Sequence, residues 1–256
     1  MFAEERRTKI LELLQKHKSM TVSELAKMLN VSEPTIRRDL AFLERKRQII
    51  RTHGGAMAIE YFSHEPTFFE KEPLEKSAKE EIGKLANSLI KDGDIIVLDS
   101  GTTTLEIARN MEDKNITVIT NSPYIVKELS MRKNIEVIVT GGSLKKGTLA
   151  LVGPIAENTL SRLHADIAFI GANGITLDAI TTTNLLEAEI KKIMIKIAST
   201  SYIVADHSKF GRTAFVKFAE PNEISGIITD SGTDSKWITA FKERKIRVIT
   251  PGGVGG

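Results

Sequence analysis

Apolar side chains near the amino end of the chain recur at the spacing of an amphipathic helix. Ile36, Leu40 and Leu43 stand at positions i, i+4 and i+7, and a turn of about 100° per residue puts them on one side of a helix. Arg38 and Arg45 lie roughly opposite, so the basic side stays free. The pattern predicts a helix with one buried face and one exposed cationic face.

The residues just before this apolar stripe carry a helix start signal. The hydroxyl of Ser32 can accept from unpaired backbone N–H groups, and Glu33 suits the positive end of the helix dipole. Pro34 lacks an amide hydrogen that would have no partner in the first turn. We therefore expect the helix to begin directly after Ser32, with the Ser32 side chain as its cap.

Two more helices and a hairpin complete this first segment. A short amphipathic helix is expected from Val22 to Leu29, and Asn30-Val31 separates it from the next helix by a turn typical of helix-turn-helix units. An earlier helix passes through Ile10 and Leu14. Residues 48–56 alternate apolar and polar positions and reach two glycines, which predicts a hairpin wing. Residues 1–57 are thus expected to form a winged helix-turn-helix.

Short apolar runs alternate with helical segments from Glu75 onward. A helix over 76–90 precedes the β-branched run 94–99, and another helix follows over 105–111. Further strands are expected at residues 116–119, 135–139, 167–171, 202–206, 224–229 and 247–250. Repetition of strand, polar loop and helix predicts an α/β domain over 74–256, built on a doubly wound, mostly parallel sheet.

Residues 58–73 lose this periodicity and are expected to be a linker. Phe68 and Phe69 are unusual for a free tether, because exposed phenylalanines are costly and flexible tethers are usually polar. We expect both rings to pack on the second domain. The alternative is that they belong to an ordinary first strand or turn of that domain.

Positive charge is concentrated in the first segment. Residues 1–57 hold 12 Lys or Arg and 7 Asp or Glu, a net of +5, so the other 199 residues carry −2 of the overall +3. A charge cluster on a helix is usually only a solvated face. Here the cluster coincides with a groove-sized helix, which favours a protein that binds the phosphate backbone of DNA.

Composition excludes several other classes of site. Cysteine is absent, so disulfides, thiolate metal sites and cysteine nucleophiles are impossible. The five histidines show no close paired spacing, and we expect neither a metal nor another cofactor. No apolar run approaches the roughly 20 residues that cross a bilayer, and the first residues lack the order of a signal peptide. A cytoplasmic protein is expected.

Small and hydroxyl residues follow several predicted strands. Ligands of doubly wound sheets bind at the carboxyl ends of the strands, where helix N-termini point inward. The loop at 100–104 offers a glycine, hydroxyl groups and a helix dipole, which suit a phosphate monoester. It could also be an ordinary turn with a threonine cap. Lys209 follows the strand at 202–205 and would lie at the same edge, unless it is simply a surface lysine.

The first segment resembles a known family. The residues that carry the resemblance are Arg6, Ile10, Leu14, Ser32, Thr35, Ile36, Arg37, Arg38, Asp39, Leu40 and the run 51–56. Together they are similar to the signature of the DeoR family of bacterial transcriptional regulators. The resemblance implies that Ser32, Thr35, Arg37 and Arg38 contact double-stranded operator DNA, with Arg51 and His53 near phosphates. Arginines can read guanine edges or clamp phosphates, and both roles stay open for each of them.

The second segment resembles the effector domain of the same family, which is itself similar to ribose 5-phosphate isomerase. The runs that carry the resemblance are 99–103, 120–122, 141–142, 166–171 and 205–211. The resemblance implies a phosphorylated sugar as ligand. The expected phosphate contacts are Ser100, Gly101, Thr102, Thr103, Asn121 and Lys209. The expected sugar contacts are Asp99, Gly142, Asp166 and Glu187.

The isomerase reaction would need a carboxylate base within reach of the sugar. Glu187 and Glu189 are the candidates, in a region similar to the base-bearing helix of the isomerase, and only one of them can face the pocket. Residues 171–174 lack the clustered acidic residues that the isomerase has after the corresponding strand. Ala179-Ile180 also departs from the glycine that family members usually carry before the following threonines. We expect a sensor with no catalytic residues.

The sequence thus predicts a transcriptional regulator of a carbohydrate-utilisation operon. We expect a repressor that responds to a phosphorylated sugar and forms a dimer or tetramer. Because no coiled-coil heptads are present, the second domain should provide the oligomer contacts. Two alternatives remain: a sugar-phosphate isomerase with an accessory DNA-binding arm, and an architectural DNA binder whose large domain serves only assembly.

Overall fold

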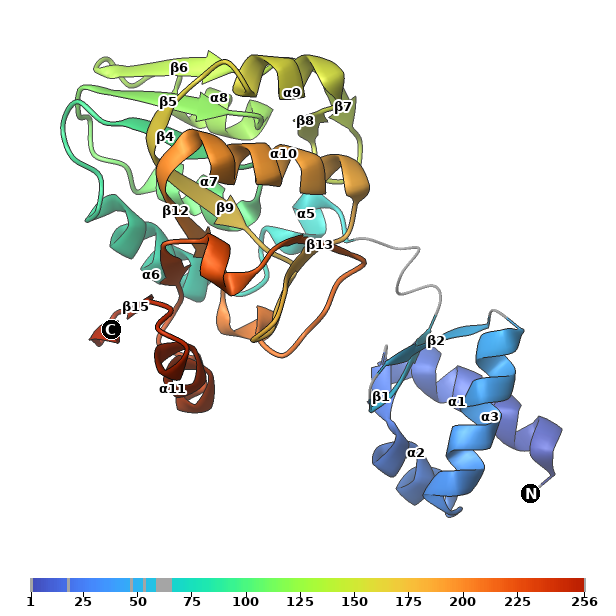
Figure 1. The fold of residues 1–256 in the computed structure, drawn as a ribbon. Helices are drawn as coiled ribbons and strands as arrows, with labels where there is room; N and C mark the ends of the chain where they lie inside the picture. The colour runs from blue at the N-terminus through green and yellow to red at the C-terminus, as the bar shows by residue number, and fades with distance from the viewer. Residues whose placement is uncertain (1, 18, 47, 53, 59–65, 256) are drawn as a thin grey trace. The chain divides into compact units, whose positions relative to one another are not determined.

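A helical bundle with a small sheet forms the first of two units, residues 1–65 and 66–256, into which the chain divides (Figure 1). The computed structural model describes residues 2–17, 19–46, 48–52, 54–58 and 66–255. Within the first unit the described elements are α1 (Ala3–His17), β1 (Ser19–Thr21), α2 (Val22–Leu29), α3 (Glu33–Arg45), β2 (Ile49–Thr52) and β3 (Gly55–Ala58).

The core of the first unit uses the predicted apolar stripe. Ile36, Leu40 and Leu43 of α3 are buried, together with Ile10 of α1 and Leu25 of α2. The strands pair antiparallel in the order β1-β3-β2. A helix-turn-helix followed by a hairpin confirms the predicted winged helix.

One glycine of the wing is required by a close backbone approach. A Cβ atom built on Gly55 would lie 2.1 Å from the carbonyl oxygen of Met20 on the neighbouring strand β1. A larger residue at this position would therefore push β3 away from β1.

The second unit is built around an eight-stranded sheet. Its strands are β4 (Ile95–Leu98), β5 (Ile116–Thr120), β6 (Ile135–Val139), β9 (Ala165–Gly171), β12 (Ala198–Val204), β14 (Gly226–Ile228), β15 (Val248–Thr250) and β16 (Gly253–Gly255). Their order is β16-β15-β14-β12-β9-β4-β5-β6, and every neighbouring pair is parallel except β15 with β16. The predicted doubly wound, mostly parallel sheet is confirmed.

The direction of winding changes between β4 and β9. From β4 the chain adds β5 and β6 on one side of the sheet, then returns to place β9 and β12 on the other. Ligands of open α/β sheets bind at the carboxyl ends of the strands on either side of such a topological switch point.

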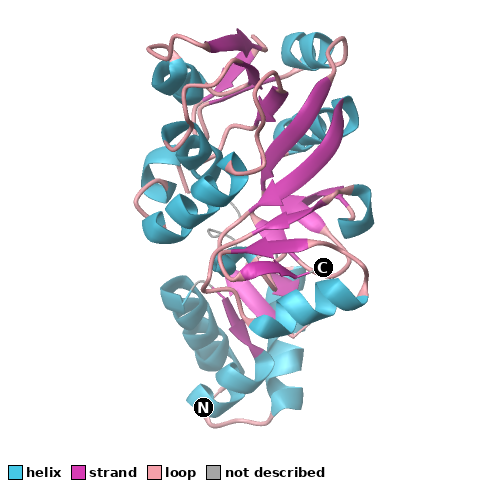
Figure 2. Ribbon diagram, turned by 90° about the vertical axis from the view of Figure 1, so that its left-hand side faces the viewer, coloured by secondary structure: helices cyan, strands magenta, loops and turns pink. Residues whose placement is uncertain are grey.

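Helices cover both faces of the sheet (Figures 1 and 2). One face packs on α6 (Lys76–Asn87), α7 (Thr102–Arg109) and α8 (Pro123–Leu129), and the other on α9 (Pro154–Leu160), α10 (Leu185–Ile197) and α11 (Ser235–Glu243). Side chains alternate between the two layers: Val97 of β4 points into the second and Ile96 into the first. The sheet is buried on both sides, which explains the continuous apolar runs of its strands.

Several short elements lie outside the predicted pattern. They are the antiparallel hairpin of β7 (Ser143–Lys145) and β8 (Ala150–Val152), the small sheet of β10 (Gly174–Ile175), β11 (Ile180–Thr182) and β13 (Val216–Ala219), and the 3-10 turns η1 (His207–Lys209) and η2 (Pro221–Glu223). Such strands of two to four residues are too short for alternation to reveal them.

The end of the expected linker belongs to the second unit. Residues 66–73 lie in that unit and include the one-turn helix α5 (Phe68–Lys71), whereas residues 59–65 lie outside the described residues. Phe68 is buried and stacks on Tyr124, with ring centroids 4.6 Å apart. Phe69 meets the same ring edge-on at 5.8 Å but remains 58% exposed. Among the described residues, no helix has the length and apolarity needed to span a membrane.

Candidate functional site

The exposed side of α3 carries most of the predicted DNA contacts. Thr35 is partly exposed in the first turn, and Arg37 and Arg38 project into solvent. Arg37 Nη2 lies 3.4 Å from a carboxylate oxygen of Glu33, one turn earlier. In the described part of the chain Arg38 forms no ion pair, so its guanidinium is available to a phosphate or a base edge.

Ser32 begins α3 as predicted but does not cap it with its side chain. It occupies the N-cap position in an extended conformation, and its hydroxyl bonds to that of Thr35 at 2.9 Å instead of accepting from a backbone N–H. The expected side-chain cap is therefore wrong. Backbone bonds from Thr35 and Ile36 to the Ser32 carbonyl start the helix without it.

The orientation of α3 is fixed by a buried carboxylate. Asp39 is 1% exposed and accepts from Arg6 at 2.5 Å and from Arg7 at 2.9 Å, both on α1. The Arg7 guanidinium also lies 3.7 Å from the centre of the Phe42 ring. These two arginines therefore hold α1 on α3, while the opposite side of α3 stays exposed.

The wing holds Arg51, one of the last two predicted DNA contacts. Arg51 is partly exposed on β2, opposite Ala56 of β3. Its Nε atom is buried and has no hydrogen-bond partner among the residues that the structure describes. His53 lies outside the described residues.

A buried ion pair occupies the switch point of the second unit. Asp99 directly follows β4, is 1% exposed, and accepts the N–H of Gly171 at the end of β9 at 3.1 Å. Its carboxylate pairs with the ammonium of Lys191 on α10, which also donates to the Gly171 carbonyl at 3.0 Å. Lys191 was not among the predicted site residues, although it follows Glu187 by four positions and so shares its helix face.

Glu187, not Glu189, faces the interior at the start of α10. Glu187 is 6% exposed, accepts the hydroxyl of Thr148, and lies 3.4 Å from the ammonium of Lys145. Glu189 is exposed and pairs with Lys192. Thr148 and Lys145 both belong to the β7–β8 hairpin, so the hairpin is an unpredicted part of the site.

The predicted phosphate loop connects β4 with the N-terminus of α7. Gly101 is the N-cap, and Thr102 and Thr103 form the first turn, partly exposed. The hydroxyl of Thr104 is buried, accepts from Gly101 N–H at 3.0 Å, and shapes the loop from inside. The N–H groups of the first helical turn point outward from a positive helix end, which is an anion-binding arrangement.

Asn121 joins this loop to the hairpin. It follows β5, is 1% exposed, and donates from Nδ2 to the Ser100 hydroxyl at 3.3 Å and to the Leu151 carbonyl at 3.1 Å. Its Oδ1 atom is buried without a hydrogen-bond partner in the described residues. An orphaned buried acceptor costs stability unless a ligand or water satisfies it.

Lys209 lies after β12, the strand next to β9, and is held by local contacts. Its ammonium is 2.8 Å from the Ser208 hydroxyl and 3.3 Å from the Asp206 carboxylate. Burial alone would raise the pKa of Asp206, but the charge of Lys209 and the hydrogen bonds from Ser208 outweigh burial and lower the pKa. The ion pair holds the lysine side chain turned toward this strand end.

Lys79 is another site residue that the sequence pattern did not single out. It is 3% exposed on the inner face of α6 and donates to the Lys71 carbonyl at 2.6 Å. The pKa of Lys79 is lowered to about 8, mainly by burial. The charge of Asp206 raises this pKa in part, and the charge of Lys209 contributes to lowering it. A lysine three positions before Ile82 on an apolar helix face was the available signal.

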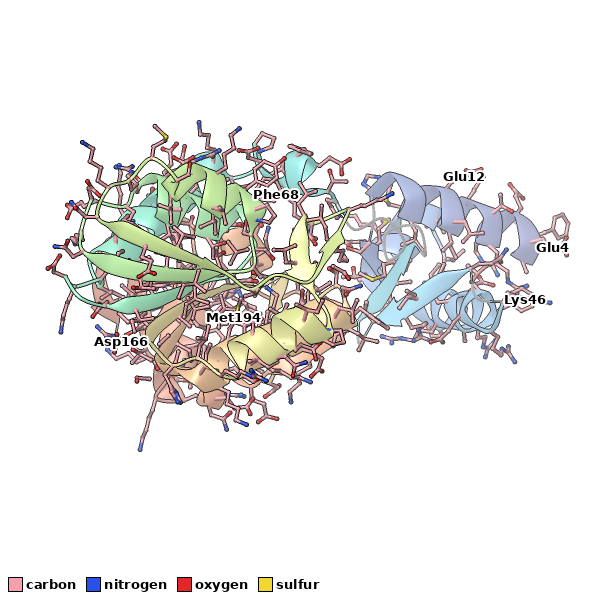
Figure 3. All side chains as sticks on the ribbon, turned by 90° about the horizontal axis from the view of Figure 1, so that it is seen from above. Glu4, Glu12, Lys46, Phe68, Asp166 and Met194 are labelled. Carbon is pink, nitrogen blue, oxygen red and sulfur yellow. The ribbon has the colours of Figure 1, made fainter. Side chains whose placement is uncertain are left out.

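Two of the predicted sugar contacts have structural roles of their own. Gly142 has φ +112°, and a Cβ there would lie 2.7 Å from the Val152 carbonyl, so hairpin packing alone requires this glycine. Asp166 lies at the amino end of β9, exposed, and accepts the Ile95 N–H at 2.8 Å (Figure 3). That is the sheet edge opposite to the switch point. The structure therefore does not bring Asp166 to the other site residues, and this position does not support the expected contact between Asp166 and the sugar.

Family comparisons match both units. Residues 6–62 match the model described as "DeoR-like helix-turn-helix domain", and residues 74–231 match "DeoR C terminal sensor domain".

Individual relatives span nearly the whole chain. The HTH-type transcriptional regulator YulB of Bacillus subtilis, described as uncharacterized, is 37% identical, covering 97% of this chain and 96% of its own. The HTH-type transcriptional repressor GlcR of the same organism is 39% identical, covering 90% and 89%. Among solved structures, ribose 5-phosphate isomerase A from Methanocaldococcus jannaschii matches with a TM-score of 0.40 and 21% identity, over 53% of this chain and 54% of that chain.

Proposed function

The chain belongs to the DeoR family of DNA-binding transcriptional regulators and is not an enzyme, and from this premise we propose that it represses a carbohydrate-utilisation operon and releases operator DNA when a phosphorylated sugar binds. The observation that carries the proposal is the combination of lysines, a helix N-terminus and an orphaned acceptor at one sheet edge. The repressor named GlcR, similar along 90% of this chain, supports the direction of control.

The first unit supplies the DNA contacts in this proposal. Ser32, Thr35, Arg37 and Arg38 line the exposed side of α3, which is the side that a helix-turn-helix unit presents to the major groove. Arg51 of the wing and also His53 lie near phosphates in this proposal. The buried clamp on Asp39 supports this assignment, because it fixes α3 without using the exposed arginines.

The phosphate of the effector binds at the N-terminus of α7. Ser100, Gly101, Thr102 and Thr103 provide hydroxyl and backbone donors, and the helix dipole favours a dianion there. Asn121 closes the loop from β5. Lys209 supplies positive charge from the neighbouring part of the same edge, and the resident pair with Asp206 loosens when the phosphate takes over the lysine.

The sugar lies along the switch point toward α10. Glu187 and Asp99 are acceptors for sugar hydroxyls. Lys145 holds the Glu187 carboxylate in place, and Lys191 holds that of Asp99. In this account Glu187 binds a hydroxyl group instead of removing a proton. Each carboxylate already has a charged partner. A sugar that leaves one of these buried groups without a hydrogen bond therefore binds more weakly, and this makes the site selective among sugars.

Regulation follows from different effector affinities in two states of an oligomer. A ligand shifts the DNA-binding equilibrium only by its difference in affinity for the two states, typically about 1–3 kcal/mol. A homodimer or tetramer places two winged helices on half-sites about 34 Å apart. The second unit carries both the effector site and the oligomer contacts in this proposal.

A thermal-shift assay tests the effector class. The full-length protein is heated with ribose 5-phosphate, glucose 6-phosphate or fructose 6-phosphate, and in parallel with the free sugars and with inorganic phosphate. A ligand that binds the folded state raises the unfolding midpoint by mass action. We expect a rise with at least one sugar phosphate and none with its free sugar. Equal shifts with a sugar and its phosphate would remove the phosphate site.

A further inference from the structure

The first helix after the linker rests on the β7–β8 hairpin. The N–H of Phe68, at the start of α5, donates to the carbonyl of Gly147 in the hairpin turn at 2.8 Å. The Phe68 ring is 3% exposed and stacks on Tyr124. Phe68 thus anchors, within the second unit, the chain segment that leads from the DNA-binding unit.

The same turn is attached to the effector site through Glu187. Thr148, the residue after Gly147, donates its hydroxyl to the buried Glu187 carboxylate, and Lys145 approaches that carboxylate at 3.4 Å. Leu149 closes the turn by donating to the Lys145 carbonyl at 2.7 Å, with a positive φ of 58°. A leucine in this conformation is strained and persists only while its surroundings hold it.

Asn121 provides a second attachment between the site and the hairpin. Leu151 of β8 donates its N–H to the Asn121 carbonyl at 2.8 Å and accepts from the Asn121 side chain at 3.1 Å. Two residues further on, α8 begins and carries Tyr124, on which Phe68 stacks. Both attachments therefore connect predicted effector contacts to Phe68.

We propose that Thr148 is the positioning residue that couples effector binding to the linker, an inference that rests on the proposed function. A sugar hydroxyl that donates to Glu187 competes with the Thr148 hydroxyl for the same carboxylate. Release of Thr148 relaxes the strained turn, moves the Gly147 carbonyl and loosens its hydrogen bond with Phe68. The effector thereby changes the anchor of the segment that leads to the winged helix.

Amide exchange on the ligand-free, full-length protein tests the coupling directly. Thr148→Val removes the hydroxyl with little change of shape, and Thr148→Ser restores it. Thr200→Val is the matched control, because it removes a hydroxyl that donates at 2.8 Å to the Asp166 carbonyl at the opposite sheet edge. We expect the peptide over residues 66–72 to exchange about tenfold faster in Thr148→Val alone. Wild-type exchange in that variant overturns the proposal.

DNA release separates coupling from a merely structural role. The probe is a duplex selected from a random library by the purified protein, titrated with the sugar phosphate that stabilises the wild type most. Thr148→Val is expected to bind this duplex as weakly as the effector-bound wild type, to respond no further to effector, and to bind effector equally or more tightly. A general loss of structure would weaken effector binding instead.

The outcomes distinguish this inference from the proposed function. A wild-type release curve for Thr148→Val overturns the coupling even though the effector binds. If no sugar phosphate stabilises the wild type, the proposed effector class fails, and the exchange rates over residues 66–72 still decide whether Thr148 controls the anchor.

Discussion

The carboxylate of Asp99 and the ammonium of Lys191 form a buried ion pair that ties the end of β4 to the middle of α10. The pair sits at the switch point of the sheet, where Lys191 also donates to the last carbonyl of β9. Three elements far apart in the sequence are thus joined at the place where the effector is proposed to bind.

Removing one member of this pair should be costly. Lys191→Met leaves the Asp99 carboxylate buried without its counter-charge, and we expect the second unit to lose about 3–5 kcal/mol of unfolding free energy in urea titrations. Asp99→Asn combined with Lys191→Met should cost less than the sum of the single variants. Strict additivity would mean that the two groups do not interact.

Arg38→Ala should weaken DNA binding. If the side chain meets a phosphate, the slope of log affinity against log salt falls by about one unit, and if it meets a base, discrimination between duplexes falls by about 1–3 kcal/mol. Fluorescence anisotropy with the selected duplex at several salt concentrations distinguishes the two. Arg162→Ala, an exposed arginine of the second unit, is the control. Unchanged affinity would place Arg38 outside the interface.

Asp39→Asn should loosen the first unit. The substitution removes the negative charge of the Asp39 carboxylate, which is 1% exposed and accepts hydrogen bonds from Arg6 and Arg7. We expect this unit to lose about 1–3 kcal/mol of unfolding free energy and to bind DNA more weakly. Glu33→Gln breaks the exposed pair with Arg37 and should change stability by no more than about 0.5 kcal/mol. Circular dichroism during unfolding measures the stability of both variants. If Asp39→Asn and Glu33→Gln lower stability equally, the clamp is contradicted.

The lowered pKa of the buried Lys79 side chain should make the protein more stable at alkaline pH. Its pKa is about 8 in the folded protein against 10.5 as the ordinary value, so between these values the unfolded chain binds more protons. Unfolding free energy therefore increases as pH rises from 8 to 10.5, by up to about 3 kcal/mol, while below pH 8 the full cost of burying the charge is present. Lys79→Met should remove this rise in urea midpoints measured across the window. Parallel curves for variant and wild type would refute the burial account.

Sequence periodicity was sufficient for the two units and for most of the sheet. The helical spacing of Ile36, Leu40 and Leu43 predicted the buried face of α3, because all three apolar side chains pack into the same core. The main strands were visible since both their faces are buried. The pairing of β11 with β13 depends on residues more than thirty positions apart, and strands of three or four residues carry no readable alternation.

The candidate site was only partly predictable, because polar residues have no period. Asp99 ended one predicted strand and Lys209 followed another, so both could be placed at the carboxyl edge. Asp166 lies at the start of its strand β9, and the direction of the chain puts it at the amino edge, where it accepts the Ile95 N–H. Lys145 and Thr148 reach Glu187 only through a hairpin that the pattern does not reveal.

The most direct test of the central claim is effector-driven release of DNA by wild type and Lys209→Ala. Complexes with the selected duplex are titrated with the sugar phosphate that stabilises the wild type most, and anisotropy reports release. Lys217→Ala, an exposed lysine paired with Glu220, is the control. The account predicts that Lys209→Ala binds the duplex normally but needs at least about tenfold more effector for release. Release of Lys209→Ala at the wild-type concentration would contradict it.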